Sequence, residues 1–497
     1  MGERPSLAVV GAGPAGLAAA LAAAARDVRV LLVDAGGQAG GQFHRQPAPA
    51  LAARRAGSPH HRGRGWERLR DGLARHRAAG RVVHLTDRHV WCVTRQEATG
   101  TFTVHSLRGP AQEEAGTVRA DGVLLATGGY ERVLPFPGWT LPGVVTAGGA
   151  QAMLKGTLVL PGRTAVVAGT GPLLLPVATA LAGAGARVVA LVESTGPGTL
   201  LRRAHALASE PGKLAEGAGY AARLLRHGVR TLTGHTVVEA HGTDRLEAVT
   251  VAALDRDGRP RPGSARRLRC DTLAVGHGML PHTDLAETLG CALSGTAVRV
   301  DAEQRTDVPG VWAAGEATGV GGADLALAEG HIAGRSAAAR LYGTVPDPRG
   351  WAAAARARAR LRTFAEALDA AYAPPARWAE AVPDDTVVCR CEEVTAGEVR
   401  EAVGALGAGD LRTVKLLTRA GMGWCQGRMC APGVAGLAGC PLTAGRRPFA
   451  RPVPLGVLAA LPEPEIPGPE TEMPQSEISP SQIPEPEIPE PEIPEPQ

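Results

Sequence analysis

Hydrophobic positions along this chain fall into short runs that end at glycine turns and are followed by longer alanine-rich segments. The first run, residues 7–10, leads into the glycine turn 11–16 and then into a segment without a helix breaker. A second run, residues 28–33, ends at an acidic residue, Asp34. This order predicts a strand, a tight turn, a helix and a second strand at the start of the chain.

Each residue type in this turn has a physical role in holding a dinucleotide. Gly11 permits the sharp turn, Gly13 lets the backbone approach a pyrophosphate, and Gly16 lets the helix pack closely on the sheet. The start of the helix, around Ala15, offers free N–H groups and about half a positive charge to the phosphates. Asp34 can accept hydrogen bonds from a ribose. The stretch therefore predicts a dinucleotide-binding unit.

Two further segments are expected at the same cofactor. The loop 36–42 is rich in glycine, and its Gly41 and Gln42 would bring backbone amides to the cofactor. The apolar run 121–125 predicts a buried strand, which ends in a turn formed by Ala126, Thr127 and Gly128. In two-domain flavoproteins a strand of this kind ends at the cofactor and leads to the next domain. The segment 130–139 that follows is too rich in proline for regular structure.

Between these segments the pattern is mixed. Residues 54–65 form a basic loop, expected on the surface with His60 and His61 in solvent. Residues 66–79 predict a helix, and the runs 82–85 and 101–107 predict two strands. We interpret both strands as part of a β-meander inserted between the cofactor-binding segments.

The first pattern recurs in the middle of the chain. The run 165–168 leads to Gly169 and Gly171, a helix follows, and the run 187–192 ends at Glu193. A repeated unit of this kind predicts a second nucleotide-binding domain. Glu193 favours a free 2′-hydroxyl, as in NAD or another adenine nucleotide, over NADP. Leu174 replaces the third glycine, however, so a structural domain with a vestigial site is the open alternative.

A third fingerprint follows after residues 270–276, a strand that we interpret as the return of the chain to the first domain. Residues 306–314 predict a strand that ends at Gly315 and Glu316, ahead of Gly322 and a helix over residues 324–341. The form is that of the second FAD fingerprint, in which the acid binds the ribityl chain and the helix N-terminus faces the flavin. The N–H dipoles of that helix would stabilise an anionic reduced flavin.

Four cysteines have the spacing of a metal site, in one C-x-C and one C-x₄-C pair: Cys389, Cys391, Cys425 and Cys430. Closing the loop between the pairs costs roughly 3 kcal/mol, against about 10 kcal/mol or more that a four-thiolate metal site returns. Such a site suits zinc or an iron–sulfur cluster. A [2Fe–2S] cluster is preferred, because zinc knuckles usually space a pair as C-x₂₋₄-C and because a neighbouring flavin would exchange electrons with it. Zinc, unliganded thiols and a disulfide are the alternatives, and Cys440 is expected to be a spare.

Charge and hydropathy exclude several classes of protein. The chain carries a formal charge of +4, its few lysines are outnumbered by arginines, and no basic stripe alternates with aromatics, so no nucleic-acid partner is expected. No apolar run is long enough for an integral membrane segment, no signal peptide is expected, and the scattered cysteines fit a reducing cytoplasm. Residues 462–497 contain ten Glu and PEPEIP repeats, which predict a disordered acidic tail.

Two stretches of sequence resemble known families. VCRCEEVT together with TRAGMGWCQGRMC resembles the bacterioferritin-associated ferredoxin type of [2Fe–2S] domain. ATGGYERVLPFPGWTLPGVVTAGGAQAMLK, followed by GTGPLLL and GEATGVGGADLALAEG, is similar to the large flavoprotein subunits of hydrogen cyanide synthase, of octopine and nopaline oxidases and of D-hydroxyproline dehydrogenase. More distantly the chain is similar to the large subunit of heteromeric sarcosine oxidase.

The resemblance implies an amino-acid dehydrogenase complex in which this chain relays electrons. A separate flavin-containing subunit would oxidise the amine, and the resemblance also allows, as a further partner, a small [2Fe–2S] subunit. The protein would be cytoplasmic, or peripheral to the membrane through its partners. The four clustered cysteines would hold the cluster, and FAD would be held by Gly11, Gly13, Ala15, Gly16, Asp34, Gly41, Gln42, Ala126, Thr127, Gly128, Gly315, Glu316 and Gly322.

The fold class expected is α/β, with two dinucleotide-binding domains of the Rossmann-like type, a small C-terminal [2Fe–2S] domain and a disordered tail. The expected divisions are an FAD-binding domain in two pieces (1–150 and 270–345), a second nucleotide-binding domain (151–269), a helical linker (346–383), the [2Fe–2S] domain (384–445) and the tail (462–497).

Two other functions compete with the relay. A self-contained NAD(P)H-dependent FAD reductase would load electrons from the second nucleotide domain, and a binding scaffold would carry inert domains. Disulfide reductases of this fold have a C-x₂-C or C-x₄-C pair beside the flavin, and residues 1–340 contain neither. No catalytic residue is predicted, since His277, His282 and His331 are each expected to be structural.

Overall fold

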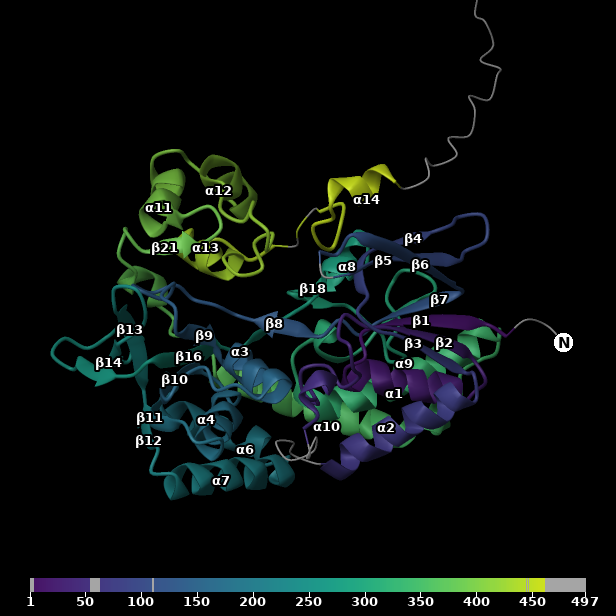
Figure 1. The fold of residues 1–497 in the computed structure, drawn as a ribbon, viewed down its shortest axis with the longest axis horizontal. Coiled ribbons are helices and arrows are strands. Elements are labelled where there is room, and N and C mark those ends of the chain that lie inside the picture. The colour runs from purple at the N-terminus through teal and green to yellow at the C-terminus, as the bar shows by residue number, and fades with distance from the viewer. Residues whose placement is uncertain (1–3, 54–62, 110, 444, 446, 461–497) are drawn as a thin grey trace, which may run out of the picture.

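The computed structural model describes residues 4–53, 63–109, 111–443, 445 and 447–460. Two α/β domains, each with a five-stranded parallel sheet, lie side by side, and a smaller domain packs beside them (Figure 1). This arrangement confirms the predicted fold class. The segment 462–497 and most of the basic loop at 54–65 lie outside the described residues. Among the helices in the described part, none is long and apolar enough to cross a membrane.

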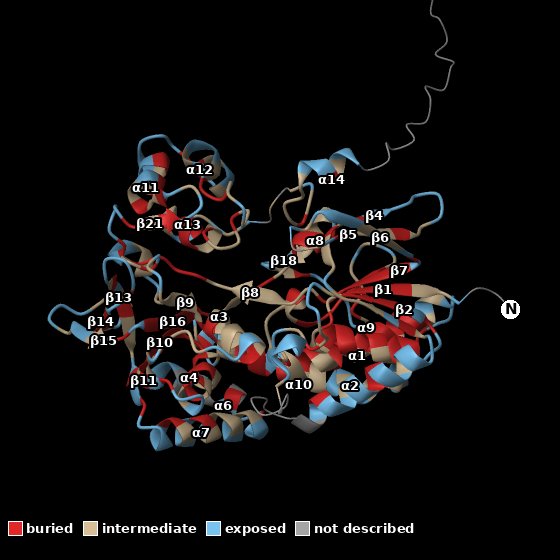
Figure 2. Cartoon of the chain, viewed as in Figure 1, coloured by how far each residue is buried: buried red, intermediate tan, exposed pale blue. Residues whose placement is uncertain are grey.

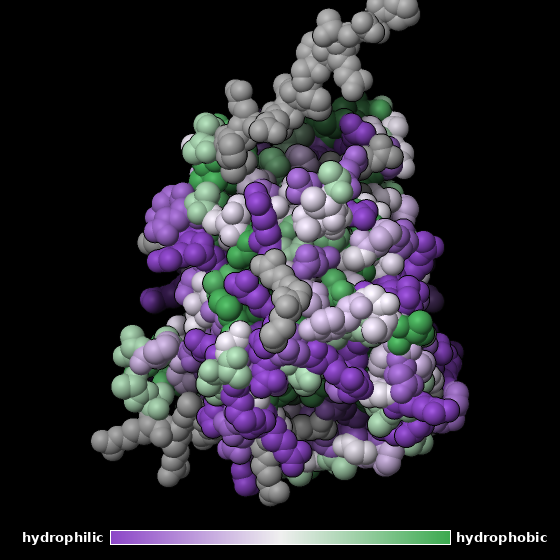
Figure 3. Space-filling model, turned by 90° about the vertical axis from the view of Figure 1, so that its right-hand side faces the viewer, coloured by the Kyte–Doolittle hydropathy of each residue, from purple (hydrophilic) through white to green (hydrophobic). Residues whose placement is uncertain are grey.

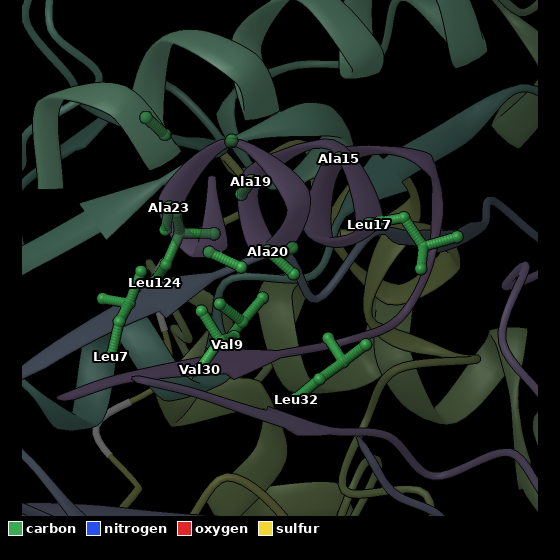
Figure 4. Packing of buried hydrophobic residues seen from close by; sticks show 14 of the residues in the cluster. Leu7, Val9, Ala15, Leu17, Ala19, Ala20, Ala23, Val30, Leu32 and Leu124 are labelled. Atoms are coloured by element: carbon green, nitrogen blue, oxygen red, sulfur yellow. The ribbon is translucent and has the colours of Figure 1, made fainter. Parts of the chain in front are cut away.

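In the sheet of the first domain, the central strand and one strand beside it are buried on both faces, as is typical of parallel sheets. Figure 4 shows Leu7, Val9 and Leu124 of the strands meeting Ala20 and Ala23 of the first helix. The strand order is β20 (Val311–Ala313), β7 (Gly122–Leu125), β1 (Ser6–Val10), β2 (Arg29–Val33) and β3 (Val82–Leu85). The helices on one face are α1 (Pro14–Ala24), α2 (Gly63–Ala78) and α9 (Gly322–Leu341).

The predicted β-meander is correct in kind but wrong in one of its members. Val82 of β3 pairs in parallel with Val30 of β2, so the run 82–85 is an edge strand of the parallel sheet. A short apolar run indicates that a strand is buried, but it does not identify the strand with which it pairs. The sequence pattern therefore could not assign this strand to the parallel sheet. The antiparallel sheet on the opposite face consists of β4 (His89–Arg95), β5 (Phe102–Arg108) and β6 (Glu114–Ala120).

The second domain repeats this three-layer design. Its parallel sheet has the order β12 (Arg230–Thr233), β11 (Arg187–Glu193), β10 (Thr164–Thr170), β16 (Thr272–His277) and β9 (Val144–Thr146). One face is covered by α3 (Ala147–Ala152), α4 (Leu174–Gly183) and α7 (Pro211–Arg226). The other face is covered by the antiparallel strands β13 (His235–His241), β14 (Ala248–Ala253) and β15 (Arg266–Arg269).

The sheet pairing moves both predicted boundaries between these domains. β9 and β16 pair with each other in the second sheet, so the chain enters the second domain before residue 150 and leaves it after residue 270. The two crossings are β8 (Gly129–Glu131) and β17 (Met279–Pro281), which pair antiparallel. The predicted domain of the run 270–276 is therefore wrong, because a buried parallel strand looks the same in either sheet.

The remaining elements connect the parts. Short helices of the second domain are α5 (Pro197–Arg202) and α6 (Ala204–Leu207), and the chain returns to the first domain through α8 (Asp284–Thr288), β18 (Leu293–Ser294) and β19 (Ala297–Val298). Single helical turns occur at Pro49–Leu51, Met153–Thr157, Gly315–Thr318, Pro348–Trp351 and Trp378–Ala381. The linker helix α10 (Ala352–Ala371) packs on α9 and on α6.

The small domain carries the clustered cysteines, and the chain then turns back to the first domain. Its elements are β21 (Val387–Cys389), β22 (Val394–Thr395), α11 (Ala396–Gly404), α12 (Leu411–Thr418) and α13 (Ala431–Leu437). The last helix, α14 (Leu455–Ala459), packs Val457 against Trp91 and Leu107 of the antiparallel sheet. The small domain is therefore followed by a segment anchored on the first domain.

Burial follows this architecture. Figure 2 shows buried residues concentrated in the central strands and in α1 and α9, with exposed residues along α2 and α7. The face shown in Figure 3 is mainly hydrophilic, with small and separate apolar areas. The apolar residues are thus used mostly to pack the layers together.

Candidate functional site

The glycine turn after β1 has the geometry expected of a phosphate-binding turn. Gly11 has a φ of +103°, and a Cβ there would lie 2.3 Å from the carbonyl oxygen of Ala126. A Cβ at Gly16 would lie 1.8 Å from the carbonyl oxygen of Gly11. Gly13 is the N-cap of α1, and Ala15 is buried in its first turn. Only glycine fits at Gly11 and Gly16, and the helix N-terminus faces the turn as anion binding requires.

The acid after β2 ties the turn to the glycine-rich loop that follows it. Asp34 Oδ1 accepts from the backbone N–H of Gly36 at 2.7 Å, and Oδ2 accepts from the backbone N–H of Ala12. A carboxylate has about four lone-pair sites, so both oxygens can still accept from ribose hydroxyls. Asp34 is therefore positioned at the predicted ribose end of the site.

The loop 36–42 packs directly on the phosphate-binding turn. The N–H of Gly40 donates to the carbonyl oxygen of Ala12 at 2.8 Å, and a Cβ at Gly41 would lie 2.8 Å from the Cα of Gly13. Gln42 is exposed, and its Oε1 accepts from Nε and Nη2 of Arg45 at 3.1 and 2.6 Å. The loop is thus close enough for its backbone to reach a ligand on the turn.

The second fingerprint meets the first through direct backbone contact between α9 and α1. A Cβ at Gly330 would lie 2.1 Å from the carbonyl oxygen of Ala15, and one at Gly334 would lie 2.2 Å from that of Ala19. A Cβ at Gly315 would lie 2.7 Å from the Cβ of Ala15. The two fingerprints, far apart in sequence, therefore share one helix pair, as a single dinucleotide site requires.

The predicted flavin end of the site comprises Glu316, Gly322 and the turn after β7. Burial raises the pKa of Glu316, whose Oε2 would lie 3.6 Å from a Cβ at Gly129. Gly128 and Gly322 have φ values of +77° and +80°, and a Cβ at either would meet no atom within 4 Å. Neither glycine is therefore packed against the rest of the protein on its Cβ side.

The turn after β7 is held by backbone contacts to the returning chain. The N–H of Ala126 donates to the carbonyl oxygen of Val10 at 2.9 Å, and Thr127 Oγ1 donates to the carbonyl oxygen of His282 at 2.5 Å. The N–H of His282 donates to the carbonyl oxygen of Gly128 at 3.0 Å. The residues at positions 126–128 are therefore fixed from both sides.

Sequence reasoning missed the residues that order the second fingerprint. Glu329 on α9 is fully buried, and its Oε2 accepts from the N–H of Gly315 at 3.0 Å and from Thr318 Oγ1 at 2.9 Å. Arg362 on α10 pairs with Glu329 and donates to the carbonyl oxygen of Gly319 at 3.0 Å. An acid inside the otherwise apolar helix segment LALAEG was the available signal, because a buried charge needs a partner.

In the second domain the glycine turn is kept but the helix starts later. Gly169 has a φ of +131°, and a Cβ there would lie 1.8 Å from the carbonyl oxygen of Gly276. Gly171 has a φ of +116° and open space beside it. α4 begins at Leu174, which is buried in the core, whereas α1 begins directly after Gly13. The leucine is accommodated by this later start of the helix.

The acid of the second turn is buried under the end of the linker helix. Glu193 accepts from the N–H groups of Gly171 and Thr195 at 3.1 and 2.9 Å, and burial raises its pKa to about 7. Thr195 Oγ1 donates to the carbonyl oxygen of Ala371 at 3.4 Å. Burial and the charge of Glu193 raise the pKa of Tyr372 to about 12. The ribose corner of this second turn is therefore covered by the C-terminal end of α10.

The four clustered cysteines lie together as the spacing predicts. Their thiols contact one another in the order Cys391, Cys425, Cys430 and Cys389. The contact with Cys430 lowers the pKa of Cys425 to about 5 and raises that of Cys430, and burial raises the pKa of Cys391. Two sulfurs from each pair in one continuous group are the ligand set of a [2Fe–2S] cluster. All eight cysteines, each of them described, are free thiols.

One glycine keeps the ligand loops close together. A Cβ at Gly423 would lie 2.1 Å from the Cβ of Cys391, so a side chain there would push the C-x-C and C-x₄-C segments apart. Among the described residues, no group of three or more His, Cys, Asp or Glu side chains is arranged to hold a metal ion. The fit to a [2Fe–2S] cluster rests on the four thiol donors and their mutual contacts.

Comparison with known proteins agrees with this geometry. Residues 5–337 match the family described as pyridine nucleotide-disulphide oxidoreductase, and residues 387–438, which include the four cysteines, match the BFD-like [2Fe-2S] binding domain. Hydrogen cyanide synthase subunit HcnB of Pseudomonas aeruginosa is 34% identical over 431 residues, 85% of this chain and 90% of that protein. An opine oxidase subunit of Rhizobium meliloti is 35% identical over 478 residues, 92% of this chain and 98% of that protein.

A solved structure shows the same fold. L-proline dehydrogenase from P. horikoshii superimposes with a TM-score of 0.62 at 20% identity, over 92% of this chain and 81% of that chain. The chain therefore belongs to the pyridine nucleotide-disulphide oxidoreductase family, as an oxidoreductase with an FAD site and a [2Fe–2S] domain, in the group that contains hydrogen cyanide synthase subunit HcnB and the matching opine oxidase subunit.

Proposed function

We propose that this chain is the electron-relaying subunit of a heteromeric amino-acid dehydrogenase. The observation that carries the proposal is that one chain combines a two-fingerprint FAD site with a four-thiol domain. Supporting it, the relatives that this chain covers almost completely are named as components of hydrogen cyanide synthase and of opine oxidase. The substrates that we propose for the assembly are D-hydroxyproline, proline, opines or glycine.

The residues of this chain would bind the cofactors and orient them. The N-terminus of α1 beside Gly11 and Gly13 would hold the pyrophosphate, and Asp34 would bind a ribose. Glu316 would bind the ribityl chain. The N-terminus of α9, near Gly322, would stabilise negative charge on the flavin ring. Bound FAD supplies two-electron chemistry and the cluster one-electron chemistry, so the pair converts one into the other.

The partners proposed are a separate flavin-containing subunit that oxidises the amine and a small [2Fe–2S] subunit. We place the complex in the cytoplasm, either free or peripheral to the membrane through its partners. The domain division that we propose keeps the expected linker and [2Fe–2S] domain and moves the crossings to β8 and β17.

The test is reconstitution. The chain is co-expressed with the products of neighbouring open reading frames, and the purified complex is screened with proline, hydroxyproline, glycine, sarcosine and opines and an artificial dye acceptor. Dye reduction by one class of amine in the complex, and none by the chain alone, is the expected result. Full activity of the chain alone would contradict the relay role.

A second candidate, an NAD(P)H-dependent FAD reductase, is favoured by the retained turn at Gly169 and Gly171. The burial of Glu193 under the end of α10 weighs against it, because a ribose would have to displace that contact. Anaerobic mixing with NADH separates the two functions. Rapid bleaching of the flavin band would favour the reductase, and an unchanged flavin band favours the relay.

A further inference from the structure

An arginine inside the C-x₄-C pair reaches out of the small domain to the FAD domain. Arg428 stands between Cys425 and Cys430, and its Nε donates to Asp284 Oδ2 at 3.0 Å. Its Nη1 donates to the carbonyl oxygen of Cys425 at 3.2 Å, and its Nη2 donates to the carbonyl oxygen of Ala450. One guanidinium thus joins a ligand loop, the FAD domain and the returning chain.

Asp284 accepts hydrogen bonds from the side chains of two arginines and one histidine. Its side chain is only 10% exposed. Besides Arg428, it accepts from Arg447 Nη1 at 2.6 Å and from His282 Nε2 at 2.9 Å. Burial by itself would raise the pKa of Asp284, but the hydrogen bond and charge of His282 and the charges of the two arginines lower it to about 2. Asp284 is therefore a buried anion that binds two segments of the C-terminal part of the chain.

The same contact leads to the predicted flavin end of the FAD site. His282, which donates to Asp284, also makes two backbone hydrogen bonds. Its carbonyl oxygen accepts from Thr127 Oγ1 at 2.5 Å, and its N–H donates to the carbonyl oxygen of Gly128 at 3.0 Å. These residues form the turn after β7. A continuous set of hydrogen bonds therefore connects the loop of Cys425 to the turn predicted to face the flavin.

The C-x-C pair makes a corresponding contact through its own arginine. Arg390 stands between Cys389 and Cys391, and its guanidinium lies 5.1 Å from the ring centroid of Trp139, within the range of a cation–π interaction. Trp139 Nε1 donates to the carbonyl oxygen of Val387 at 2.6 Å. Trp139 ends the proline-rich segment 130–139, which is irregular as predicted except for its first two residues, which belong to β8.

A close apolar contact lies beside this second arginine. A Cβ at Gly433 on α13 would lie 2.9 Å from Cδ of Pro135. The proline-rich segment 130–139 thus fits directly against the small domain. Each of the two ligand pairs is therefore tied to the rest of the protein at a different place.

We propose that Asp284 and Trp139 are positioning residues that hold the four-cysteine domain in one orientation against the flavoprotein, each through the arginine that lies between two ligand cysteines. Neither residue is one of the four predicted ligand cysteines. Their effect is to keep the separation between the cluster and the flavin constant. The proposal depends on the FAD site and the [2Fe–2S] domain, and is independent of which amine the complex oxidises.

The experiment compares full-length holoprotein with Asp284→Asn and Arg390→Gln variants. Amide hydrogen exchange is followed at residues 279–290, 387–395 and 423–432, with iron and flavin content measured in parallel. Losing one partner of a buried charge pair is expected to increase exchange at residues 279–290 and 423–432 about tenfold or more in Asp284→Asn. Arg390→Gln, at an exposed side chain, is expected to affect mainly residues 387–395. Asp284→Glu is expected to restore part of the protection.

The second measurement is the rate of electron transfer from the flavin to the cluster, which loss of packing elsewhere would not change. EDTA supplies the electrons, the bound flavin takes them up under illumination, and the oxidised cluster then accepts one electron from the reduced flavin. Cluster reduction is expected to slow several-fold in Asp284→Asn while the iron content stays constant. The matched control is Glu380→Gln, which removes an exposed pair with Arg259, 2.9 Å apart, that joins the second domain to the linker.

The outcomes separate clearly. Faster exchange and slower cluster reduction in Asp284→Asn, absent in Glu380→Gln, support the proposal. Wild-type exchange and wild-type cluster reduction in both test variants would overturn it, as would an equal effect of Glu380→Gln. If Asp284→Asn does not fold, Arg390→Gln alone decides by the same two measurements.

Discussion

Arg362 on the linker helix α10 pairs with the fully buried carboxylate of Glu329 on α9. Through this pair a helix outside the two nucleotide-binding domains stabilises the second FAD fingerprint, because Glu329 also accepts from the N–H of Gly315. Arg358 on the same helix lies 3.8 Å from Glu329. The linker therefore supports the segment predicted to bind FAD as well as connecting to the small domain.

Replacing Glu329 with Gln is expected to lower both stability and FAD retention. The change leaves two arginines facing a neutral group, and removing one partner of a buried pair costs about 3–5 kcal/mol. Urea unfolding and FAD content after gel filtration measure the effect. The control is Glu114→Gln, whose exposed pair with Arg108 is expected to contribute little. Retention of full FAD content by Glu329→Gln would show that the buried pair does not order the site.

Alanine substitutions at two helical glycines are expected to have opposite results. Gly16→Ala would place a Cβ 1.8 Å from the carbonyl oxygen of Gly11, so the turn must open and FAD binding should be lost. Gly183→Ala, near the end of α4, meets no atom within 4 Å and is expected to be neutral or stabilising by up to about 1 kcal/mol. FAD fluorescence of the purified variants and their Tm values test both. Normal flavin content in Gly16→Ala would contradict the close-packing account of this turn.

Serine substitutions should separate the ligand cysteines from the other thiols. Changing Cys389, Cys391, Cys425 or Cys430 to Ser is expected to remove the cluster while FAD remains bound. Cys440→Ser is the control and is expected to keep the iron. Iron analysis and the visible absorption of the cluster are the measurements. Loss of iron on substitution of Cys440 would require a different ligand set.

The buried carboxyl of Glu193 is expected to make stability depend on pH. Its pKa rises from 4.5 to about 7 on folding, mainly through burial, so the native state holds a proton that the unfolded chain has released. The contribution of Glu193 to the free energy of unfolding is therefore fully present below about pH 4.5. It decreases by roughly 3 kcal/mol as the pH rises to about 7. Glu193→Gln removes this dependence.

The measurement for Glu193 is the difference in Tm between wild type and Glu193→Gln at pH 5 and pH 8. The Tm of the variant, relative to the Tm of wild type, is expected to be higher at pH 8 than at pH 5. A difference that is the same at both pH values would mean that Glu193 does not change its protonation on folding.

Part of this architecture could be read directly from the residues. The turn at Gly11 and Gly16 was predictable because a side chain at either position would collide with the backbone. Glycines at this spacing therefore indicate the turn by themselves. The four cysteines were predictable because thiolates at such spacing have few other uses. The antiparallel meander was predicted, but β3 was assigned to it wrongly, since burial alone does not select a strand partner.

What the sequence by itself determined is local: the glycine turns, the acids that end the strands, and the two close cysteine pairs, since each depends on residues close together in the chain. Only the tertiary structure decided to which sheet β9 and β16 belong. It also decided three contacts, those of Glu329 with Arg362, of Asp284 with Arg428 and of Trp139 with Arg390. These contacts join distant segments. Each depends on packing that a short stretch of residues does not encode.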